Sequence, residues 1–173
     1  MDEVIFSEHS RPRLILVTGP SGIGKTTWCS SQLVQARQRR LSVGGLLSPG
    51  MYQQSTKVGI LLVNLASGEE RVMARLRETE DPQAPTRKWA MDEAVLQWGD
   101  RILERLGRCD LLFIDELGPL EFLHHQGLCQ AFPLIQRRQF STALVVVRPT
   151  LLEIARQTWS DFDLDVHVVG PPG

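Results

Sequence analysis

The sequence predicts an α/β fold in which helices cover both faces of a mostly parallel sheet, a three-layer α/β/α sandwich. Two observations carry this prediction: short apolar runs rich in β-branched residues recur along the chain, and longer amphipathic stretches separate them. The runs at 13–18, 111–115 and 143–147 are almost continuously apolar, as buried parallel strands are. A chain of 173 residues, 42% of them apolar, predicts a single domain over 1–173 with a substantial core.

The amphipathic stretches between these runs predict helices long enough to connect parallel strands by crossovers. We expect helices over 26–40, 91–106 and 121–139. Pro133 lies inside the third stretch and is expected to kink or shorten it, because proline removes a backbone donor from a helix interior.

Residues 43–75 interrupt the alternation of strands and helices. Three short strand-like pieces, at 43–50, 57–65 and 69–75, are separated by turn residues such as those of the string ASGEE. This pattern predicts an antiparallel hairpin inserted into the α/β frame. The polar stretch 77–88 that follows contains two prolines and predicts a surface loop.

The string VTGPSGIGKTTW, residues 17–28, carries the strongest functional signal. Gly19, Gly24, Lys25 and Thr26 satisfy the pattern G-x-x-x-x-G-K-[ST] between a predicted strand and a predicted helix. In this context the glycines let the backbone curl, so that N–H groups and the helix N-terminus face phosphate oxygens. The predicted nucleotide-binding residues are Gly19, Pro20, Ser21, Gly22, Ile23, Gly24, Lys25, Thr26 and Thr27.

Three side chains of this loop have predicted roles toward a triphosphate. Lys25 is expected to reach the β- and γ-phosphates as a catalytic charge, Thr26 to offer its hydroxyl to Mg²⁺, and Thr27 to contact the α-phosphate. The string DLLFIDELGPLE supports this, because it places Asp115 and Glu116 at the end of a buried strand, where a carboxylate needs a partner. We expect Asp115 to hold Mg²⁺ and Glu116 to orient or deprotonate an attacking water.

These motifs give the sequence a resemblance to a known family. The strings GPSGIGKTT, DELGPLEF and KVGILLVNLASGE together resemble the nucleoside-triphosphatase family first described from thermophiles, whose vertebrate member is a cancer-related NTPase. The stretch 115–121 is its most specific mark, and the resemblance extends from about residue 13 to residue 147. It implies a P-loop NTPase fold, RecA-like or kinase-like, and Mg²⁺-dependent hydrolysis of ATP, GTP and other nucleoside triphosphates with weak base selectivity.

Further positions fit the same family, and two segments depart from it. Gly45, Gly59 and the pair Lys88-Trp89 look like recurring family positions: a glycine of the second strand, a hairpin glycine, and an aromatic residue after a basic one. The string SPGMYQQ replaces an acidic segment after the second strand, and an Asn-Arg pair is absent from the string DFDLDVHVVGPPG. The departures remove a charge that faces the nucleotide and a neighbour of the base, so the base preference stays open.

Several side chains are candidates for contacts beyond the two motifs. An arginine that stabilises charge on the γ-phosphate is expected among Arg75, Arg77, Arg87 and Arg148, and Arg148 ranks first because it ends an apolar strand. Trp89 lies beside the polar loop and is a candidate for stacking on the base.

Composition argues against other classes of protein. Nineteen Lys and Arg against twenty Asp and Glu leave a formal charge of −1, so no broad basic surface is expected for nucleic acid. The three cysteines lack the spacing of a zinc site or a disulfide framework, and the adjacent His124 and His125 accompany no second ligand pattern. No apolar run is long enough to cross a bilayer and the string MDEVIFSEHSRPR is unlike a signal peptide, so we expect a cytoplasmic protein without membrane contact.

Two other interpretations of the same motifs stay open. A small P-loop kinase would bind the triphosphate in the same way and transfer the phosphoryl group to a second substrate, with the loop 77–88 as a lid. A nucleotide-dependent regulatory module would bind tightly and turn over slowly. Strong stimulation of triphosphate turnover by a metabolite would favour the kinase, and capture of a protein partner would favour the regulatory module.

Overall fold

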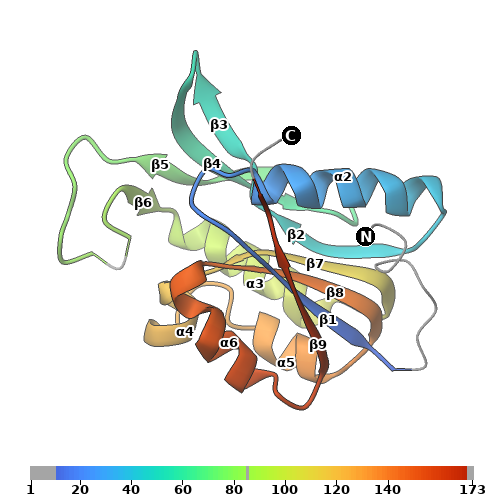
Figure 1. The fold of residues 1–173 in the computed structure, drawn as a ribbon. Coiled ribbons are helices and arrows are strands. Elements are labelled where there is room, and N and C mark those ends of the chain that lie inside the picture. The colour runs from blue at the N-terminus through green and yellow to red at the C-terminus, as the bar shows by residue number, and fades with distance from the viewer. Residues whose placement is uncertain (1–10, 85, 171–173) are drawn as a thin grey trace.

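The computed structural model describes residues 11–84 and 86–170, and its strands form one nine-stranded mixed sheet (Figure 1). The strand order is β6-β5-β4-β2-β7-β8-β1-β9, and β3 pairs with β4 outside this order. The strands are β1 (Arg13–Thr18), β2 (Val43–Leu47), β3 (Gly50–Gln53), β4 (Thr56–Asn64), β5 (Glu70–Leu76), β6 (Trp89–Met91), β7 (Cys109–Leu117), β8 (Phe140–Val147) and β9 (Asp163–Val168). The helices are α2 (Lys25–Gln38), α3 (Glu93–Arg105), α4 (Pro119–His124), α5 (Ala131–Gln136) and α6 (Leu152–Thr158), with a 3₁₀ turn η1 (Pro149–Leu151). Strands and helices alternate along much of the chain, which confirms the predicted α/β class.

The middle of the sheet is parallel. Strands β2, β7, β8, β1 and β9 are paired in the same direction, and β8 lies between β1 and β7. Because parallel strands end at the same edge of a sheet, the segments that follow β1, β7 and β8 meet there. This edge therefore gathers the glycine-rich loop, the acidic pair and Arg148.

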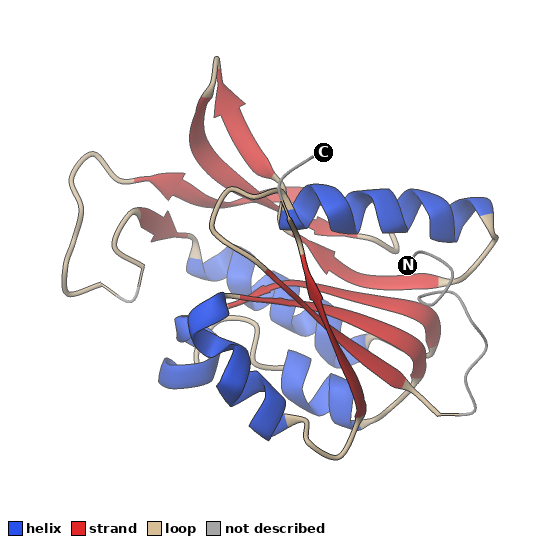
Figure 2. Ribbon diagram, viewed as in Figure 1, coloured by secondary structure: helices blue, strands red, loops and turns tan. Residues whose placement is uncertain are grey.

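Helices cover both faces of this parallel part (Figure 2). Helix α2 lies on one face, where Cys29 and Leu33 join an apolar cluster that contains Val17. Helices α3, α5 and α6 lie on the other face, where Trp98 joins a larger cluster that contains Leu16. Neighbouring residues of one strand thus belong to different clusters, which explains why its sequence is apolar at successive positions.

Antiparallel strands extend the sheet beyond β2. Strand β4 pairs antiparallel with β2, β3 and β5, and β5 pairs in the same way with β6. The predicted strand-like piece 43–50 is divided between β2 and the start of β3, and β2 also pairs in parallel with β7. The hairpin proper is therefore built from β3, β4 and β5, and its β3–β4 turn projects away from the sheet in Figure 1.

The long helix predicted over 121–139 is wrong. This segment forms the short helices α4 and α5, which the stretch 125–130 separates. His125 (φ 52°) and Gly127 (φ 79°) adopt left-handed conformations that end the first helix. Pro133 lies in the first turn of α5, where a backbone N–H has no partner within the helix, so this proline does not cause the break.

The run predicted at 13–18 coincides with β1, and the other predicted elements are found with shifted ends. The second predicted helix begins after Met91, which belongs to β6. Strands β6 and β9 and helix α6 had no predicted counterpart. Within 11–84 and 86–170, no helix has the length and apolar character needed to span a membrane. The string that bears on a signal peptide lies mostly in residues 1–10, outside the described residues.

Candidate active site

The glycine-rich loop connects β1 to the 14-residue helix α2. Gly22 (φ 79°) and Gly24 (φ 100°) have left-handed backbone conformations that other residues adopt only with strain. Gly19 has a close neighbour instead, because a Cβ there would lie 2.9 Å from the carbonyl oxygen of Val169. The loop therefore requires glycine at these positions for its curvature and packing, and it leads into a helix N-terminus, where backbone N–H groups are free to bind an anion.

Lys25 is the first residue of α2, and its side chain folds back into the loop. Its Nζ donates to the carbonyl oxygens of Gly19, at 2.8 Å, and Pro20, at 3.0 Å. The residue is only 9% exposed. A buried ammonium held at the centre of the loop offers its charge to any phosphate that enters.

Asp115 lies near the end of β7 and is 1% exposed. Its Oδ2 accepts a hydrogen bond from the backbone N–H of Ser48 at 3.1 Å, and Thr26 gives it a side-chain hydrogen bond. The Ser48 hydroxyl donates to the Asp115 carbonyl oxygen. Burial raises the pKa of Asp115 to about 6, against the hydrogen bonds from Ser48 and Thr26. A cation beside a buried carboxylate of this kind stabilises its charged form.

The donors at this point fit Mg²⁺. The described part of the chain holds no group of three or more His, Cys, Asp or Glu side chains that could bind a metal by themselves. Mg²⁺ needs no such group, because it is held by one or two protein oxygens together with phosphate oxygens and water. Asp115 and Thr26, which are hydrogen-bonded to each other, supply such oxygens.

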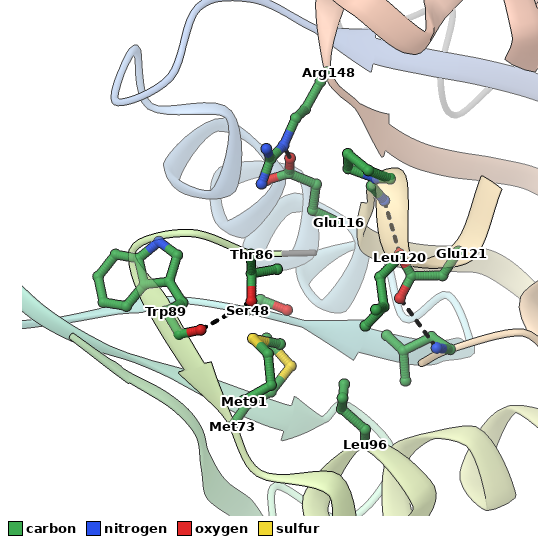
Figure 3. A pocket seen from close by; sticks show the side chains of 13 residues that line it. Ser48, Met73, Thr86, Trp89, Met91, Leu96, Glu116, Leu120, Glu121 and Arg148 are labelled. Atoms are coloured by element: carbon green, nitrogen blue, oxygen red, sulfur yellow. Dashed lines mark hydrogen bonds and ion pairs between the residues drawn. The ribbon is translucent and has the colours of Figure 1, made fainter. Parts of the chain in front are cut away.

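Glu116 differs from its neighbour because its side chain is partly open to solvent. Its Oε1 accepts a hydrogen bond from Nε of Arg148 at 2.8 Å (Figure 3). The two side chains are 33% and 49% exposed. The pair joins the end of β7 to the end of β8, so the predicted water-orienting acid and the first-ranked arginine are in contact.

One cavity of about 640 Å³ is lined by Lys25, Glu116 and Arg148. Its wall is built from the glycine-rich loop with Lys25, from Glu116, from the segment that begins at Arg148, and from two segments of the antiparallel extension. Those two segments supply Lys57 of β4 and residues 86–89, and Nζ of Lys57 lies 5.4 Å from the centre of the Trp89 ring. The structure thus brings Lys25, Glu116, Arg148 and Trp89 to one cavity.

Two of the candidate arginines and the two adjacent histidines lie outside this cavity. Arg75 is exposed on β5, and Arg77 lines a separate cavity with Glu93 and Asp100. Arg87 does line the cavity that contains Glu116. His124 and His125 are exposed at the end of α4.

Sequence reasoning missed two residues that shape the site. Ser48, the first residue of the departing string SPGMYQQ, contacts Asp115 as described above. Glu121 is 5% exposed, and its carboxylate accepts from the backbone N–H of Gly118, at 2.9 Å, and of Leu128, at 3.1 Å. Burial raises the pKa of Glu121. The glutamate three residues after a helix-capping position was a signal for this contact.

A strand, a glycine-rich loop and a helix N-terminus, next to a buried acid on a nearby parallel strand, define the P-loop class of nucleotide-binding proteins. Comparison of the sequence with known protein families identifies one family within this class. Residues 14–157 match the sequence model of a family described as NTPase, and the chain belongs to that family. This confirms the resemblance seen in the sequence.

Named relatives agree with this membership. The nucleoside-triphosphatase THEP1 of Methanothermobacter thermautotrophicus is 31% identical over 91% of this chain and 87% of its own length. That of Caldivirga maquilingensis is 31% identical over 73% of this chain and 70% of its own. For that of Thermococcus kodakarensis, also 31% identical, the match spans 65% of this chain and 64% of the relative.

Two solved structures have a similar fold. The solution structure of a human cancer-related nucleoside triphosphatase superposes with a TM-score of 0.65 at 19% identity, over 91% of this chain and 89% of that one. The crystal structure of THEP1 from Aquifex aeolicus gives a TM-score of 0.59 at 16% identity, over 91% and 90%. At these identities the likeness supports the fold and nothing finer.

Proposed function

We propose that this protein is a Mg²⁺-dependent nucleoside-triphosphatase that hydrolyses ATP, GTP and other nucleoside triphosphates to the diphosphate and phosphate, with weak base selectivity. The observation that carries the proposal is the convergence of Lys25, the buried Asp115 and the open Glu116 at one edge of the sheet. The fold we propose is the three-layer α/β/α sandwich of P-loop NTPases, because helices lie on both faces of the sheet.

The glycine-rich loop and Lys25 bind the triphosphate. Backbone N–H groups of the loop and of the first turn of α2 bind the phosphate oxygens, and the Lys25 ammonium exchanges its contacts with loop carbonyls for the β- and γ-phosphates. Thr27, the third residue of α2, is proposed to contact the α-phosphate. Asp115 and Thr26 hold Mg²⁺, which when bound neutralises charge on the β- and γ-phosphate oxygens.

Glu116 orients the attacking water. One of its carboxylate oxygens accepts a hydrogen bond from the water and takes up its proton as the water oxygen bonds to the γ-phosphorus. The bond from that phosphorus to the oxygen of the β-phosphate breaks, and the diphosphate leaves with the electron pair. The partial exposure of Glu116 supports this role, because the carboxylate must reach a water molecule.

Arg148 is proposed to stabilise the charge of the transferring group. In this structure its guanidinium is bonded to Glu116 at 2.8 Å, within reach of the γ-phosphate side of the cavity. When the triphosphate is bound, the guanidinium moves to the γ-phosphate oxygens, and the Glu116 carboxylate then accepts a hydrogen bond from the attacking water instead. The location of Trp89 in the same cavity supports a contact on the γ-phosphate side more than stacking on the base.

Phosphate release from ATP, GTP, CTP and UTP, each with Mg²⁺ or with EDTA, tests the proposal. We expect release from all four triphosphates and its loss in EDTA. Asp115→Asn should lose the Mg²⁺-dependent release, whereas Asp163→Asn, the same change at an exposed position of β9, should retain it. Tight binding of Mg²⁺ and nucleotide without release would contradict the proposal and favour a regulatory module.

A further inference from the structure

The cavity beside Glu116 has room for more than the terminal phosphates and one water molecule. It measures about 640 Å³; a water molecule takes about 30 Å³ of it, and the phosphates take the part that is lined by the glycine-rich loop and Lys25. Its lining continues from the phosphate loop past Glu116 to β4 and to the segment 86–89. This space is open in the described structure next to the position that the attacking water takes.

The nucleoside of the bound triphosphate leaves the loop in another direction. In the proposed binding mode the γ-phosphate lies near Glu116 and the α-phosphate near Thr27, so we expect the nucleoside beyond Thr27. Among the described residues that line the cavity, Lys25 is the only member of α2. The cavity therefore extends from the γ-phosphate on the side away from the nucleoside, where the acceptor of a phosphoryl group must lie.

The walls of this cavity are strongly cationic. Lys57, Arg87 and Lys88 line it in addition to Arg148 and Lys25, whereas Glu116 is its one lining carboxylate among the described residues. Arg87 and Lys88 are exposed, and the ion pair of Lys88 with Glu80 is long, at 3.8 Å, with both side chains mostly in solvent. Such a pair contributes little, so the charge is available to an anion.

An apolar recess of about 80 Å³ adjoins the cationic cavity (Figure 3). The two spaces share Thr86, Trp89, Glu116 and Arg148 in their walls. The recess is otherwise lined mainly by apolar side chains from the antiparallel extension and from the helical face, and Figure 3 labels Met73, Met91, Leu96 and Leu120 among them. Leu128 also belongs to this set.

We propose that this cavity and recess bind a second substrate, an aromatic phosphate of the size of a nucleoside monophosphate, and that the protein transfers the γ-phosphoryl group to it. The cations hold the acceptor phosphate, and Trp89 with the methionines of the recess holds the ring. The inference rests on the proposed function, because it uses the same triphosphate site. When the acceptor is absent, water attacks the γ-phosphorus in its place, and the triphosphate is hydrolysed.

The transfer step balances without any further reactant. A phosphate monoester is mostly a dianion at neutral pH, so one of its oxygens attacks the γ-phosphorus without a base. That oxygen bonds to the γ-phosphorus, the bond to the oxygen of the β-phosphate breaks, and the electron pair leaves with the diphosphate. One triphosphate and one monophosphate thus give two diphosphates, and no inorganic phosphate forms.

Label transfer tests the proposal directly. The full-length protein is incubated with Mg²⁺, γ-labelled ATP and AMP, GMP, CMP or UMP, and labelled diphosphate is separated from labelled phosphate. We expect at least one monophosphate to receive the label, with a matching fall in labelled phosphate. Label found only in inorganic phosphate with all four would overturn the acceptor site, while the release itself would still support the hydrolase.

Variants locate the acceptor site. Lys57→Glu should reduce label transfer about tenfold or more and leave phosphate release in the absence of an acceptor unchanged. Arg156→Glu, the same change of charge on the exposed face of α6, should alter neither. Glu116→Gln should lower release more than transfer, because the phosphate oxygen needs no base. Equal transfer by wild type and Lys57→Glu would contradict the assignment of this cavity.

Discussion

At the scale of single residues, Gly45 shows a position where no other residue fits. It lies on β2 with φ at 100°, and a Cβ there would be 1.9 Å from the carbonyl oxygen of Phe113 on β7. The two strands are neighbours in the parallel part of the sheet, and Asp115 follows Phe113 by two residues. The family position noted in the sequence is thus explained by the close approach of two backbones near Asp115, the proposed Mg²⁺ ligand.

Gly45→Ala is expected to destabilise the protein by about 2–6 kcal/mol, since overpacking and backbone strain each cost about 1–3 kcal/mol. The free energy of unfolding in urea measures this. Gly107→Ala is the control, because a Cβ at that position has no heavy atom within 4 Å, and its effect should stay within about 0.5 kcal/mol. Similar stabilities of the two variants would contradict the packing described for Gly45.

Glu121 is a positioning residue for the segment that follows Glu116. Its two carboxylate oxygens accept from Gly118 and Leu128, and a Cβ at Gly127 would lie 2.3 Å from Oε1. The two hydrogen bonds of the carboxylate thus link the turn after β7 to the stretch 125–130, which precedes α5. The site depends on this buried contact as well as on the residues that face the nucleotide.

Glu121→Gln is expected to cost about 1–3 kcal/mol of stability, because an amide has one acceptor oxygen for two buried N–H groups. It should also lower the rate of phosphate release with little change in nucleotide affinity, since the turn orients Glu116. Thermal unfolding and steady-state kinetics measure the two effects. Glu78→Gln, the same change at an exposed position, should have neither. A stable Glu121→Gln variant with full activity would exclude the positioning role.

At the scale of elements, burial decides which parts could be predicted. The strands β1, β7 and β8 are buried on both faces, so their composition alone indicates them. Edge strand β9 is mostly exposed or half-buried, and its sequence DLDVHV has no such signal. The break between α4 and α5 depends on left-handed conformations at His125 and Gly127, and the buried hydrogen bond from the Leu128 N–H to Glu121 joins residues seven positions apart. Local sequence patterns do not contain that contact.

Helix α3 is the element whose start is best defined by its own sequence. Asp92 precedes it, and Oδ1 of its side chain accepts from the backbone N–H of Val95 at 3.2 Å. The predicted start at Met91 was early because that residue pairs with Ala74 in the sheet. Strand pairing therefore takes Met91 out of the helix and leaves Asp92 as its cap.

Asp92→Ala is expected to destabilise the protein by about 1 kcal/mol, because it leaves a helix N–H without its partner. Asp92→Ser should restore most of the loss, since serine also caps helices. Circular dichroism with urea unfolding measures both variants. An alanine variant as stable as wild type would show that the cap contributes nothing to α3.

At the scale of the whole molecule, the parallel sheet assembles the site. Both motifs could be predicted from the sequence, because each is a short string at the end of a buried strand, and β1 and β7 end at the same edge. The contribution of Lys57 and Trp89 to the cavity could not be derived from local patterns, since it depends on how β4, β5 and β6 extend the sheet. The contact of Arg148 with Glu116 depends in turn on β8 lying beside β7.

We propose that one edge of this sheet binds a triphosphate through Lys25 and cleaves it with the help of Glu116. The most direct test measures nucleotide affinity and phosphate release from ATP with Mg²⁺ for wild type, Lys25→Ala and Glu116→Gln. We predict that Lys25→Ala loses productive binding. Glu116→Gln should bind nucleotide like wild type and release phosphate at least about 100-fold more slowly. Release by Glu116→Gln at the wild-type rate would contradict the role of this residue and the account of the site built on it.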